Sequence, residues 1–376
     1  MHDAIGKVSA RQANPASGLN GDGAALAVDR AIGELRRGRA IAIVDADRSL
    51  LFAPVETMNS RLLGRLTAAS AESELLLTAE RLRASGLAPD ARGPMAIPLA
   101  EDTSLESLKA LTGMAANNDP GTTVKTCAAS DDDLVLAAFG LAKAARLVPA
   151  LVGFSTEASA DATLHSVSLG AVLEHAASTG GGMQLVSESR VPLAGSEKSR
   201  VALFRDEYGG SEHVAVIIGD PDLTASVPVR LHSACLTGDL LGSLRCDCGE
   251  QLQTAVERIA ALGGGVLLYL DQEGRSIGLA NKLRAYTIQD TGVDTFDADR
   301  HLGFSADERS YDIAAAMLQR LGVSAVRLLT NNPQKIDALR EHGIDVTDRL
   351  PLVAEPNEHN EAYLRSKRER AGHLSE

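Results

Sequence analysis

Three of the four cysteines in this 376-residue chain lie close together in the sequence. Cys235, Cys246 and Cys248 have the spacing C-x10-C-x-C, and thiolates of this number suit Zn²⁺, which prefers tetrahedral coordination by sulfur and nitrogen. Structural zinc sites use four protein ligands, whereas catalytic sites leave one position to water. The spacing therefore predicts one catalytic zinc ion per chain with water as its fourth ligand. The alternative is three small buried apolar side chains, which the polar neighbours Arg245 and Asp247 disfavour.

Two further residues bear on this metal site. His232 precedes Cys235 by three residues in a strand-like stretch, so its side chain is expected to face the other way. We assign it to the substrate or to hydrogen bonds that support the site, and not to the metal. Cys127 stands alone in the first half of the chain and is given no function.

The segment QEGRSIGL (272–279) places Glu273 and Arg275 on either side of Gly274. A residue without a side chain lets a ligand approach the backbone closely. Arginine binds phosphate with two hydrogen bonds, and a glutamate accepts from purine N–H groups. The alternative is an ordinary exposed turn.

Two other segments point to an anionic ligand. LLTNNPQK (328–335) predicts a strand, then a helix with Pro333 at its first position, whose free N–H groups would face an anion near Thr330 and Lys335. Helix capping alone would also explain the two asparagines. GFSADERSYD (303–312) predicts a helix start at Asp307, where Arg309 is unfavourable unless an anion compensates its charge. Together the segments predict a zinc hydrolase acting on a phosphorylated nucleotide.

The elements that must position these residues alternate along the chain. Hydrophobic patterning predicts strands at 40–46, 150–154, 201–208, 212–220, 227–234, 265–270 and 325–330. It predicts helices at 26–38, 134–148, 249–262, 278–290, 307–322 and 332–343. This pattern is typical of the α/β class with mixed (α+β) sheets, in two domains. A glycine-rich stretch at 176–184 separates them, so we expect a flexible tail at 1–22 and domains at 23–178 and 186–373.

Composition narrows the class of protein. A formal net charge of −13 disfavours a nucleic-acid-binding protein. The apolar stretch 134–154 is interrupted by Lys143, Arg146 and Pro149, so it predicts no membrane segment. The N-terminus lacks the apolar core of a signal peptide, which predicts a cytoplasmic protein with reduced cysteines.

The second half resembles the GTP cyclohydrolase II family. The resemblance rests on VRLHSACLTGD, SLRCDCGEQL, DQEGRSIGLANKLRAY, LGFSADER and RLLTNNPQK, in this order. It implies a homodimeric enzyme for the first committed step of riboflavin biosynthesis. That enzyme hydrolyses GTP to formate, pyrophosphate and 2,5-diamino-6-(5-phospho-ribosylamino)pyrimidin-4(3H)-one, using Zn²⁺ and Mg²⁺.

The resemblance also implies roles for individual residues. The family's zinc ligands fall on Cys235, Cys246 and Cys248, and its catalytic positions fall on Tyr286, Asp307 and Arg309. Asp307 would accept a proton. Arg309 corresponds to a residue described as a nucleophile toward the α-phosphate, but a guanidinium stays protonated, so we interpret it as a clamp on developing phosphate charge. The nucleotide-contacting positions are Arg230, His232, Ser233, Gln251, Glu273, Gly274, Arg275, Thr295, Thr330 and Lys335. Mg²⁺ would bind the GTP phosphates.

One position departs from that family. Ala234 stands where many members carry a glutamate, directly before the first zinc cysteine. Because the other motif positions are intact, we interpret this departure as a tolerated variation.

The first half resembles 3,4-dihydroxy-2-butanone 4-phosphate synthase at 31–48 and 133–154. That family binds Mg²⁺ through a dense acidic cluster, yet here Asp45 and Asp47 are followed by no carboxylate at 49–53. CAASDD (127–132) replaces the family's Arg-x-Gly-His-Thr-Glu segment. Since Mg²⁺ needs several oxygen ligands, we expect a degenerate domain that keeps the fold without the activity. The alternatives are a bifunctional enzyme and a non-catalytic regulatory or scaffold protein.

Overall fold

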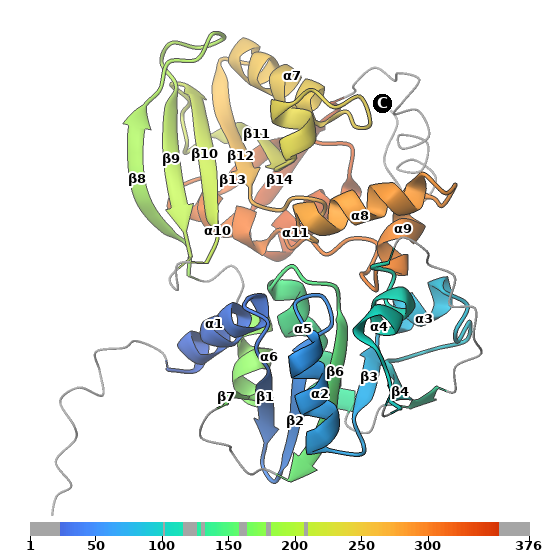
Figure 1. Ribbon diagram of the computed structural model, residues 1–376. Helices are drawn as coiled ribbons and strands as arrows, with labels where there is room; N and C mark the ends of the chain where they lie inside the picture. Colours follow the sequence, from blue (N-terminus) through green and yellow to red (C-terminus); the bar gives the residue numbers. More distant parts are fainter. Residues whose placement is uncertain are drawn as a thin grey trace, which may run out of the picture.

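Two seven-stranded sheets, one in each half of the chain, form the framework of the protein (Figure 1). The computed structural model describes residues 23–100, 102–115, 126–128, 132–157, 164–177, 182–206 and 210–352. The predicted tail at 1–22 and the last part of the second predicted domain, from 353, lie outside these residues. Two domains of mixed α/β structure confirm the predicted fold class. The exact domain boundaries stay predictions.

The N-terminal domain carries its sheet in the order β5-β4-β3-β6-β2-β1-β7. Its strands are β1 (Ile41–Asp45), β2 (Arg48–Pro54), β3 (Glu74–Leu77), β4 (Met95–Pro98), β5 (Cys127–Ala128), β6 (Ala150–Glu157) and β7 (His165–Ser168). Its helices are α1 (Gly23–Arg36), α2 (Ser60–Ala69), α3 (Ala79–Ala84), α4 (Leu105–Leu111), α5 (Asp132–Ala144) and α6 (Leu169–Ala177). Alternate strand residues face opposite sides: Leu76 packs in the core with α1, α5 and α6, whereas Leu75 and Leu77 pack in the core with α2, α3 and α4.

The C-terminal domain carries the second sheet, in the order β14-β13-β11-β12-β10-β9-β8. Its strands are β8 (Gln184–Arg190), β9 (Arg200–Arg205), β10 (Glu212–Gly219), β11 (Ser226–Ser233), β12 (Gly264–Leu270), β13 (Ala325–Leu329) and β14 (Asp345–Leu350). Its helices are α7 (Cys248–Ala261), α8 (Leu279–Gln289), α9 (Thr295–His301), α10 (Asp312–Arg320) and α11 (Pro333–Glu341), with a π-helical turn at Leu236–Leu240. Strands β11 to β14 are parallel, and β8, β9 and β10 continue the sheet antiparallel.

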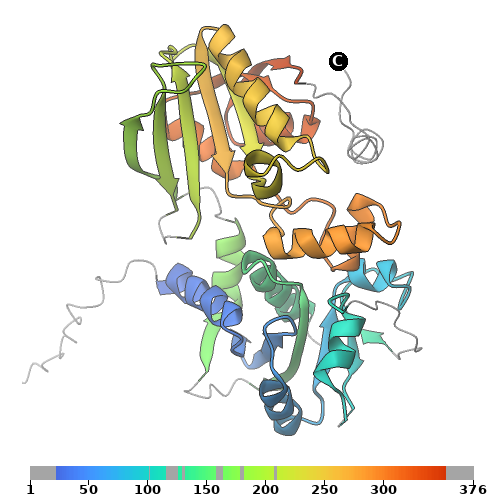
Figure 2. The ribbon, with the colours of Figure 1, turned by 45° about the horizontal axis from the view of Figure 1, so that its top comes forward.

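Helices cover both faces of this second sheet. Helices α10 and α11 pack on one face, where Met317 and Leu339 join Val229 and Leu231 in the larger core. Helix α7 packs on the other face through Ile259. Helices α8 and α9 leave the sheet and lie between the two domains, with α9 against α3 (Figure 2). Within the described residues, no helix is long and apolar enough to span a membrane.

Two expected helices have other bounds in the structure, and several elements were not predicted, among them β8, β14 and α9 in the C-terminal domain and β2 to β5 in the N-terminal domain. The helix expected at 307–322 begins only at Asp312, and the helix expected at 134–148 ends at Ala144. Strand β8 was not predicted, because its residues are exposed on both faces and show no hydrophobic alternation.

Candidate active site

The predicted site residues gather at one edge of the C-terminal sheet. Parallel strands β11, β12 and β13 end at this edge, and the segments that follow them carry most of the motifs. Ligands of open α/β sheets bind outside the carboxyl ends of the strands for the same reason. The fold therefore brings together segments that are up to about 100 residues apart in the chain.

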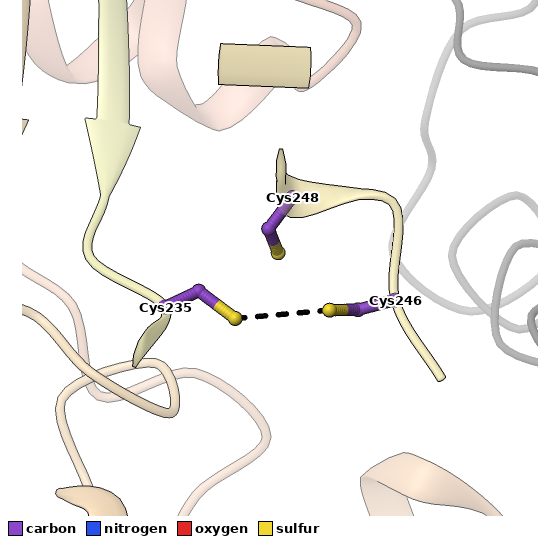
Figure 3. Close-up of side chains that lie close together, drawn as sticks. All are labelled: Cys235, Cys246 and Cys248. Carbon is purple, nitrogen blue, oxygen red and sulfur yellow. Dashed lines mark hydrogen bonds between the residues drawn. The ribbon is translucent and has the colours of Figure 1, made fainter. Parts of the chain in front are cut away.

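The three cysteines point toward one another (Figure 3). Their sulfur atoms all lie within 4.8 Å of one another, and those of Cys235 and Cys246 are 3.7 Å apart. Cys235 follows β11, whereas Cys248 is the first residue of α7, one residue ahead of the helix start predicted at 249. Gly238 leaves room for the cluster, since a Cβ there would lie 2.7 Å from the Cys246 sulfur. Three converging sulfurs beside a glycine fit a thiolate-bound zinc ion.

Lys282 on α8 supplies positive charge to this cluster. Its ammonium group donates hydrogen bonds to the Cys235 sulfur at 3.0 Å and to Glu273 at 2.7 Å. Hydrogen bonds from the other two thiols, and then from Lys282, lower the pKa of Cys235. The hydrogen bond with Cys235 raises the pKa of Cys246. Hydrogen bonds with Cys235 and Cys246, together with burial, raise the pKa of Cys248. One thiolate therefore forms readily in the free protein.

Asp239 organises the approach to Cys235. Its carboxylate accepts hydrogen bonds from the Cys235 backbone N–H and the Tyr269 hydroxyl, both at 2.9 Å, and contacts His232 Nε2 at 3.1 Å. His232 thus lies outside the sulfur cluster, stacked on the Tyr269 ring. Burial lowers the pKa of His232. Its buried Nδ1 has no hydrogen-bond partner among the described residues.

Basic side chains are buried beside the sheet edge. Arg230 donates to the Leu329 carbonyl at 2.9 Å and to Gln251 at 2.5 Å, and burial lowers its pKa to about 10. Lys335 on α11 donates to the Leu231 carbonyl at 2.8 Å. Buried cations need anions close by; the charge of the buried Asp247 acts on Arg230, and a phosphate bound here would meet both basic side chains.

Nearby, Thr330 and Ser233 are held by their neighbours. The Thr330 hydroxyl accepts a hydrogen bond from the Asn332 backbone N–H at 3.0 Å. The Ser233 hydroxyl donates to Gln272 at 3.1 Å, and Gln272 in turn donates to the Ser310 carbonyl at 2.5 Å. Gln272 therefore connects β11 to the segment that carries the predicted catalytic residues.

Asp307 and Arg309 form a two-pronged ion pair ahead of α10. Arg309 donates to the two carboxylate oxygens at 2.9 and 2.6 Å. Burial alone would raise the pKa of Asp307, but the hydrogen bond from Arg309 and its charge outweigh burial and lower this pKa. Arg309 lies ahead of α10 and not in the first turn of a helix, contrary to the prediction. It therefore needs no anion to offset a helix dipole, and its charge is balanced by Asp307.

Tyr311 connects this ion pair to Lys335. The guanidinium of Arg309 and the ammonium of Lys335 each lie 5.5 Å from its ring centroid. Burial raises the pKa of Tyr311 to about 12, and its hydroxyl has no hydrogen-bond partner among the described residues. Sequence reasoning missed Tyr311, although it stands two residues after Arg309.

The loop after β12 has an unusual backbone. Gly274, Arg275 and Ser276 have φ values of +62°, +61° and +75°, a region that residues other than glycine adopt at a cost. The Arg275 guanidinium pairs with the buried Asp299 of α9. This pairing holds the loop in the conformation that brings Glu273 to Lys282.

Tyr286 and Thr295 lie on the α8–α9 side of the site. The Arg245 guanidinium lies 4.5 Å from the Tyr286 ring centroid, and burial raises the pKa of Tyr286 to about 12. Tyr286 is therefore protonated at neutral pH and is a hydrogen-bond donor. Thr295 is the first residue of α9, and its contact with the nucleotide stays a prediction.

Comparisons with known proteins identify the class of protein and then the family. A family model described as GTP cyclohydrolase II matches residues 184–351. A protein of Azospirillum brasilense named GTP cyclohydrolase-2 is 43% identical over 375 residues, which cover 96% of this chain and 97% of that protein. One of Xylella fastidiosa (strain 9a5c), with the same name, is 41% identical over 94% of this chain and 88% of its own length. The protein is a hydrolase. It belongs to the GTP cyclohydrolase II family, which serves riboflavin biosynthesis.

Two further comparisons give a shorter match and a match to a solved structure. A GTP cyclohydrolase-2 of Shewanella amazonensis is 55% identical over 171 residues, which are 46% of this chain and 83% of that protein. A crystal structure of RibBX, a two-domain 3,4-dihydroxy-2-butanone 4-phosphate synthase from A. baumannii, aligns over 87% of this chain and 99% of that one. Its TM-score is 0.31 and its sequence identity 15%, so it supports no conclusion about either domain.

Proposed function

We propose that this chain hydrolyses GTP to formate, pyrophosphate and 2,5-diamino-6-(5-phospho-ribosylamino)pyrimidin-4(3H)-one, and that the reaction depends on zinc. The observation that carries the proposal is the convergence of three sulfur atoms within 4.8 Å beside Lys282 and Asp239. Cys235, Cys246 and Cys248 would hold the ion. When bound there, zinc would supply a Lewis acid that makes water a nucleophile at neutral pH.

The surrounding side chains have separate tasks in this reaction. Asp307 has a lowered pKa and is a carboxylate at neutral pH, and it would accept a proton once the substrate draws Arg309 away, because the ion pair with Arg309 weakens it as a base. Tyr286 keeps its proton and is suited to donate a hydrogen bond. Arg309 and Lys335, which flank the Tyr311 ring, would bind the phosphates and stabilise their developing charge.

The remaining predicted contacts would position the nucleotide. Arg230, Gln251, His232 and Ser233 lie at or beside the end of β11. Glu273 is occupied by Lys282 and by the Leu236 N–H in the free protein, so reading the purine edge would require it to exchange one of these partners. Mg²⁺ would arrive with the phosphates, since the described residues hold no carboxylate cage for it.

We also propose that the N-terminal domain, residues 23–178, is a degenerate synthase-like domain and that residues 186–373 form the cyclohydrolase domain. In the N-terminal domain Asp45 pairs with Arg48 at 2.8 Å across the β1–β2 turn. Among the described residues of this domain no group of carboxylates lies close enough to hold Mg²⁺, which needs several oxygen ligands. Formation of the butanone phosphate from ribulose 5-phosphate tests this proposal. Clear turnover would favour the bifunctional alternative.

We also propose that the chain forms a homodimer and that it acts in the cytoplasm. Leu240, Leu241 and Leu244, close to the cysteines in the chain, are 73, 70 and 57% exposed. A group of exposed leucines of this kind is typical of an interaction surface. Light scattering of the purified chain measures the oligomeric state, and a monomer at micromolar concentration would contradict the dimer.

The zinc dependence is tested by Cys246→Ser. Since a hydroxyl is a weaker zinc ligand than a thiolate, we expect bound zinc to fall from one per chain and formate release to fall about 100-fold or more. Cys127→Ser is the matched control, because it changes the cysteine outside the cluster. Full turnover by a zinc-free Cys246→Ser protein would refute the zinc dependence. Absence of formate from the zinc-loaded wild type would favour the scaffold alternative.

A further inference from the structure

The N-terminal domain contacts the segments that carry the predicted catalytic residues. Buried Arg81 of α3 donates to the His301 carbonyl at 2.6 Å, and the Thr78 hydroxyl donates to the Gly303 carbonyl at 2.9 Å. A Cβ on Gly303 would lie 2.9 Å from that hydroxyl. The backbone that leads into Asp307 is therefore fixed by the other domain at its first residues.

A second contact reaches the residue between Asp307 and Arg309. The Lys143 ammonium at the end of α5 donates to Glu308 at 2.7 Å. The same Glu308 oxygen accepts the Ser305 backbone N–H at 2.6 Å, which closes the turn ahead of the ion pair. Both charged side chains are more than two-thirds buried, so the pair is shielded from solvent more than a surface ion pair is.

A third contact reaches the loop that follows β12. Arg146 donates to the Asp271 carboxylate at 2.6 Å and to the Asp271 carbonyl at 3.0 Å. Its own carbonyl accepts a hydrogen bond from Asn281 at 2.9 Å. The side chain also lies against Gly278, whose Cβ would be 3.1 Å from the Arg146 Cβ. Arg146 thus braces the strained loop that carries Glu273 and Arg275.

The backbone of Arg146 is itself strained. It follows the last turn of α5 with φ = +60°, a position that glycine usually occupies. An arginine is less favourable there than a glycine. Such strain persists where other contacts determine the conformation. Here the contacts with Asp271, Asn281 and Gly278 hold Arg146 in this conformation.

The polar contacts lie around a gap in the interface. A cavity of about 250 Å³ lies between the domains. It is lined by Lys143 and Arg146 together with His213, Phe304 and Ser310. The ion pairs Lys143–Glu308 and Arg146–Asp271 both border this cavity and join the N-terminal domain to the segments that carry the predicted site residues.

We propose that Lys143 and Arg146 are positioning residues for the cyclohydrolase reaction, so that the N-terminal domain acts as a brace for the segments 271–278 and 301–309. This inference rests on the proposed roles of Asp307 and Arg309. Lys143 acts through Glu308, and Arg146 acts through Asp271. Neither side chain needs to touch GTP.

Arg146→Gly is the sharpest test, because it removes the brace while relieving the backbone strain. We expect kcat to fall roughly 2- to 30-fold, with a smaller change in KM and no loss of thermal stability in the N-terminal domain. Ala46→Gly is the matched control: Ala46 also has a positive φ (+50°), in an exposed turn of the same domain. It should leave kcat unchanged.

Lys143→Met tests the other ion pair independently. We expect a fall in kcat of the same size, with partial recovery in Lys143→Arg, which restores the charge. Arg39→Ala, which breaks the exposed ion pair with Glu34, is the control. Hydrogen exchange of the amides at 271–278 and 301–309 gives a readout that does not depend on turnover, and it should become faster in both test variants.

The outcomes separate this inference from the proposed function. If the wild type hydrolyses GTP and both test variants keep its kcat and its hydrogen-exchange rates, the brace alone is refuted. If the wild type releases no formate but hydrogen exchange is faster in both test variants, the brace is supported and the proposed reaction is refuted. If the wild type releases no formate and exchange is unchanged in the variants, both proposals are refuted.

Discussion

At the scale of single residues, the candidate metal site depends on one position without a side chain. Gly238 faces the three cysteines, and an added Cβ would lie 2.7 and 3.0 Å from the sulfurs of Cys246 and Cys235. The spacing of the cysteines predicted that they come together, but it did not indicate which glycine makes room for their sulfur atoms.

Gly238→Ala should therefore weaken zinc binding by roughly 10- to 100-fold, the range found when groups next to metal ligands are altered. Competition with a zinc chelator measures the affinity. Gly140→Ala, in α5 where nothing lies within 4 Å of the added Cβ, is the matched control. Equal zinc affinity in the two variants would contradict the tight packing.

Other residues of the site could not be read from the sequence. Lys282, Asp239 and Tyr311 look like ordinary charged or aromatic residues of their segments. Their importance comes from contacts with the Cys235 sulfur, the Cys235 N–H and the side chains of Arg309 and Lys335. Such contacts join elements that no sequence spacing relates.

At the scale of elements, hydrophobic periodicity predicted most strands and helices of the C-terminal domain. It failed at 307–311, where acidic residues resemble a helix start but the segment stays irregular until Asp312. Two side-chain contacts compete with the helix there: Asp307 accepts the Arg309 N–H, and Glu308 accepts the Ser305 N–H. Short polar side chains commonly compete with helix formation in this way.

Helix α3 provides a test at this scale. Arg81 is 2% exposed and its guanidinium donates to the Leu111, His301 and Ala110 carbonyls. Arg81→Met keeps much of the volume but leaves these carbonyls without a donor, so the free energy of unfolding should fall by roughly 2–4 kcal/mol. Urea denaturation measures it.

Arg83→Met, on the same helix, is the control for that experiment. Its side chain is 45% exposed, and the expected loss is about 1 kcal/mol or less. If both variants lost the same stability, the buried contacts of Arg81 with α9 would have no special weight.

At the scale of the whole molecule, the junction between the domains contains a buried histidine. His213 is 1% exposed, and its Nδ1 accepts the Asp271 backbone N–H at 3.1 Å. Burial lowers its pKa below 6.5, against the opposing effects of Asp271 and Asp206, while Arg146 lowers it further. The folded protein therefore holds the neutral form.

This shift makes stability depend on pH with a defined sign. Because the folded pKa is lowered, the stabilisation is complete above pH 6.5 and is lost as the pH falls from 6.5 through the folded pKa. His213→Asn keeps an acceptor but does not titrate, so its melting temperature should fall less than that of the wild type between pH 7.5 and 5.5. Equal falls would contradict the assignment. His342→Asn, on the surface, serves as the control.

The sequence by itself determined which three cysteines could form one metal site, most of the alternation of helices and strands in the C-terminal domain, and the motifs that indicate the family. These features depend on residue type and local spacing, which are complete in the chain. The tertiary structure decided the contacts of Lys282 and Asp239 with Cys235. It also decided the hydrogen bond from the N-terminal domain to the segment before Asp307. Those contacts join residues far apart in the chain, and they exist only where packing of the two sheets and their helices brings the elements together.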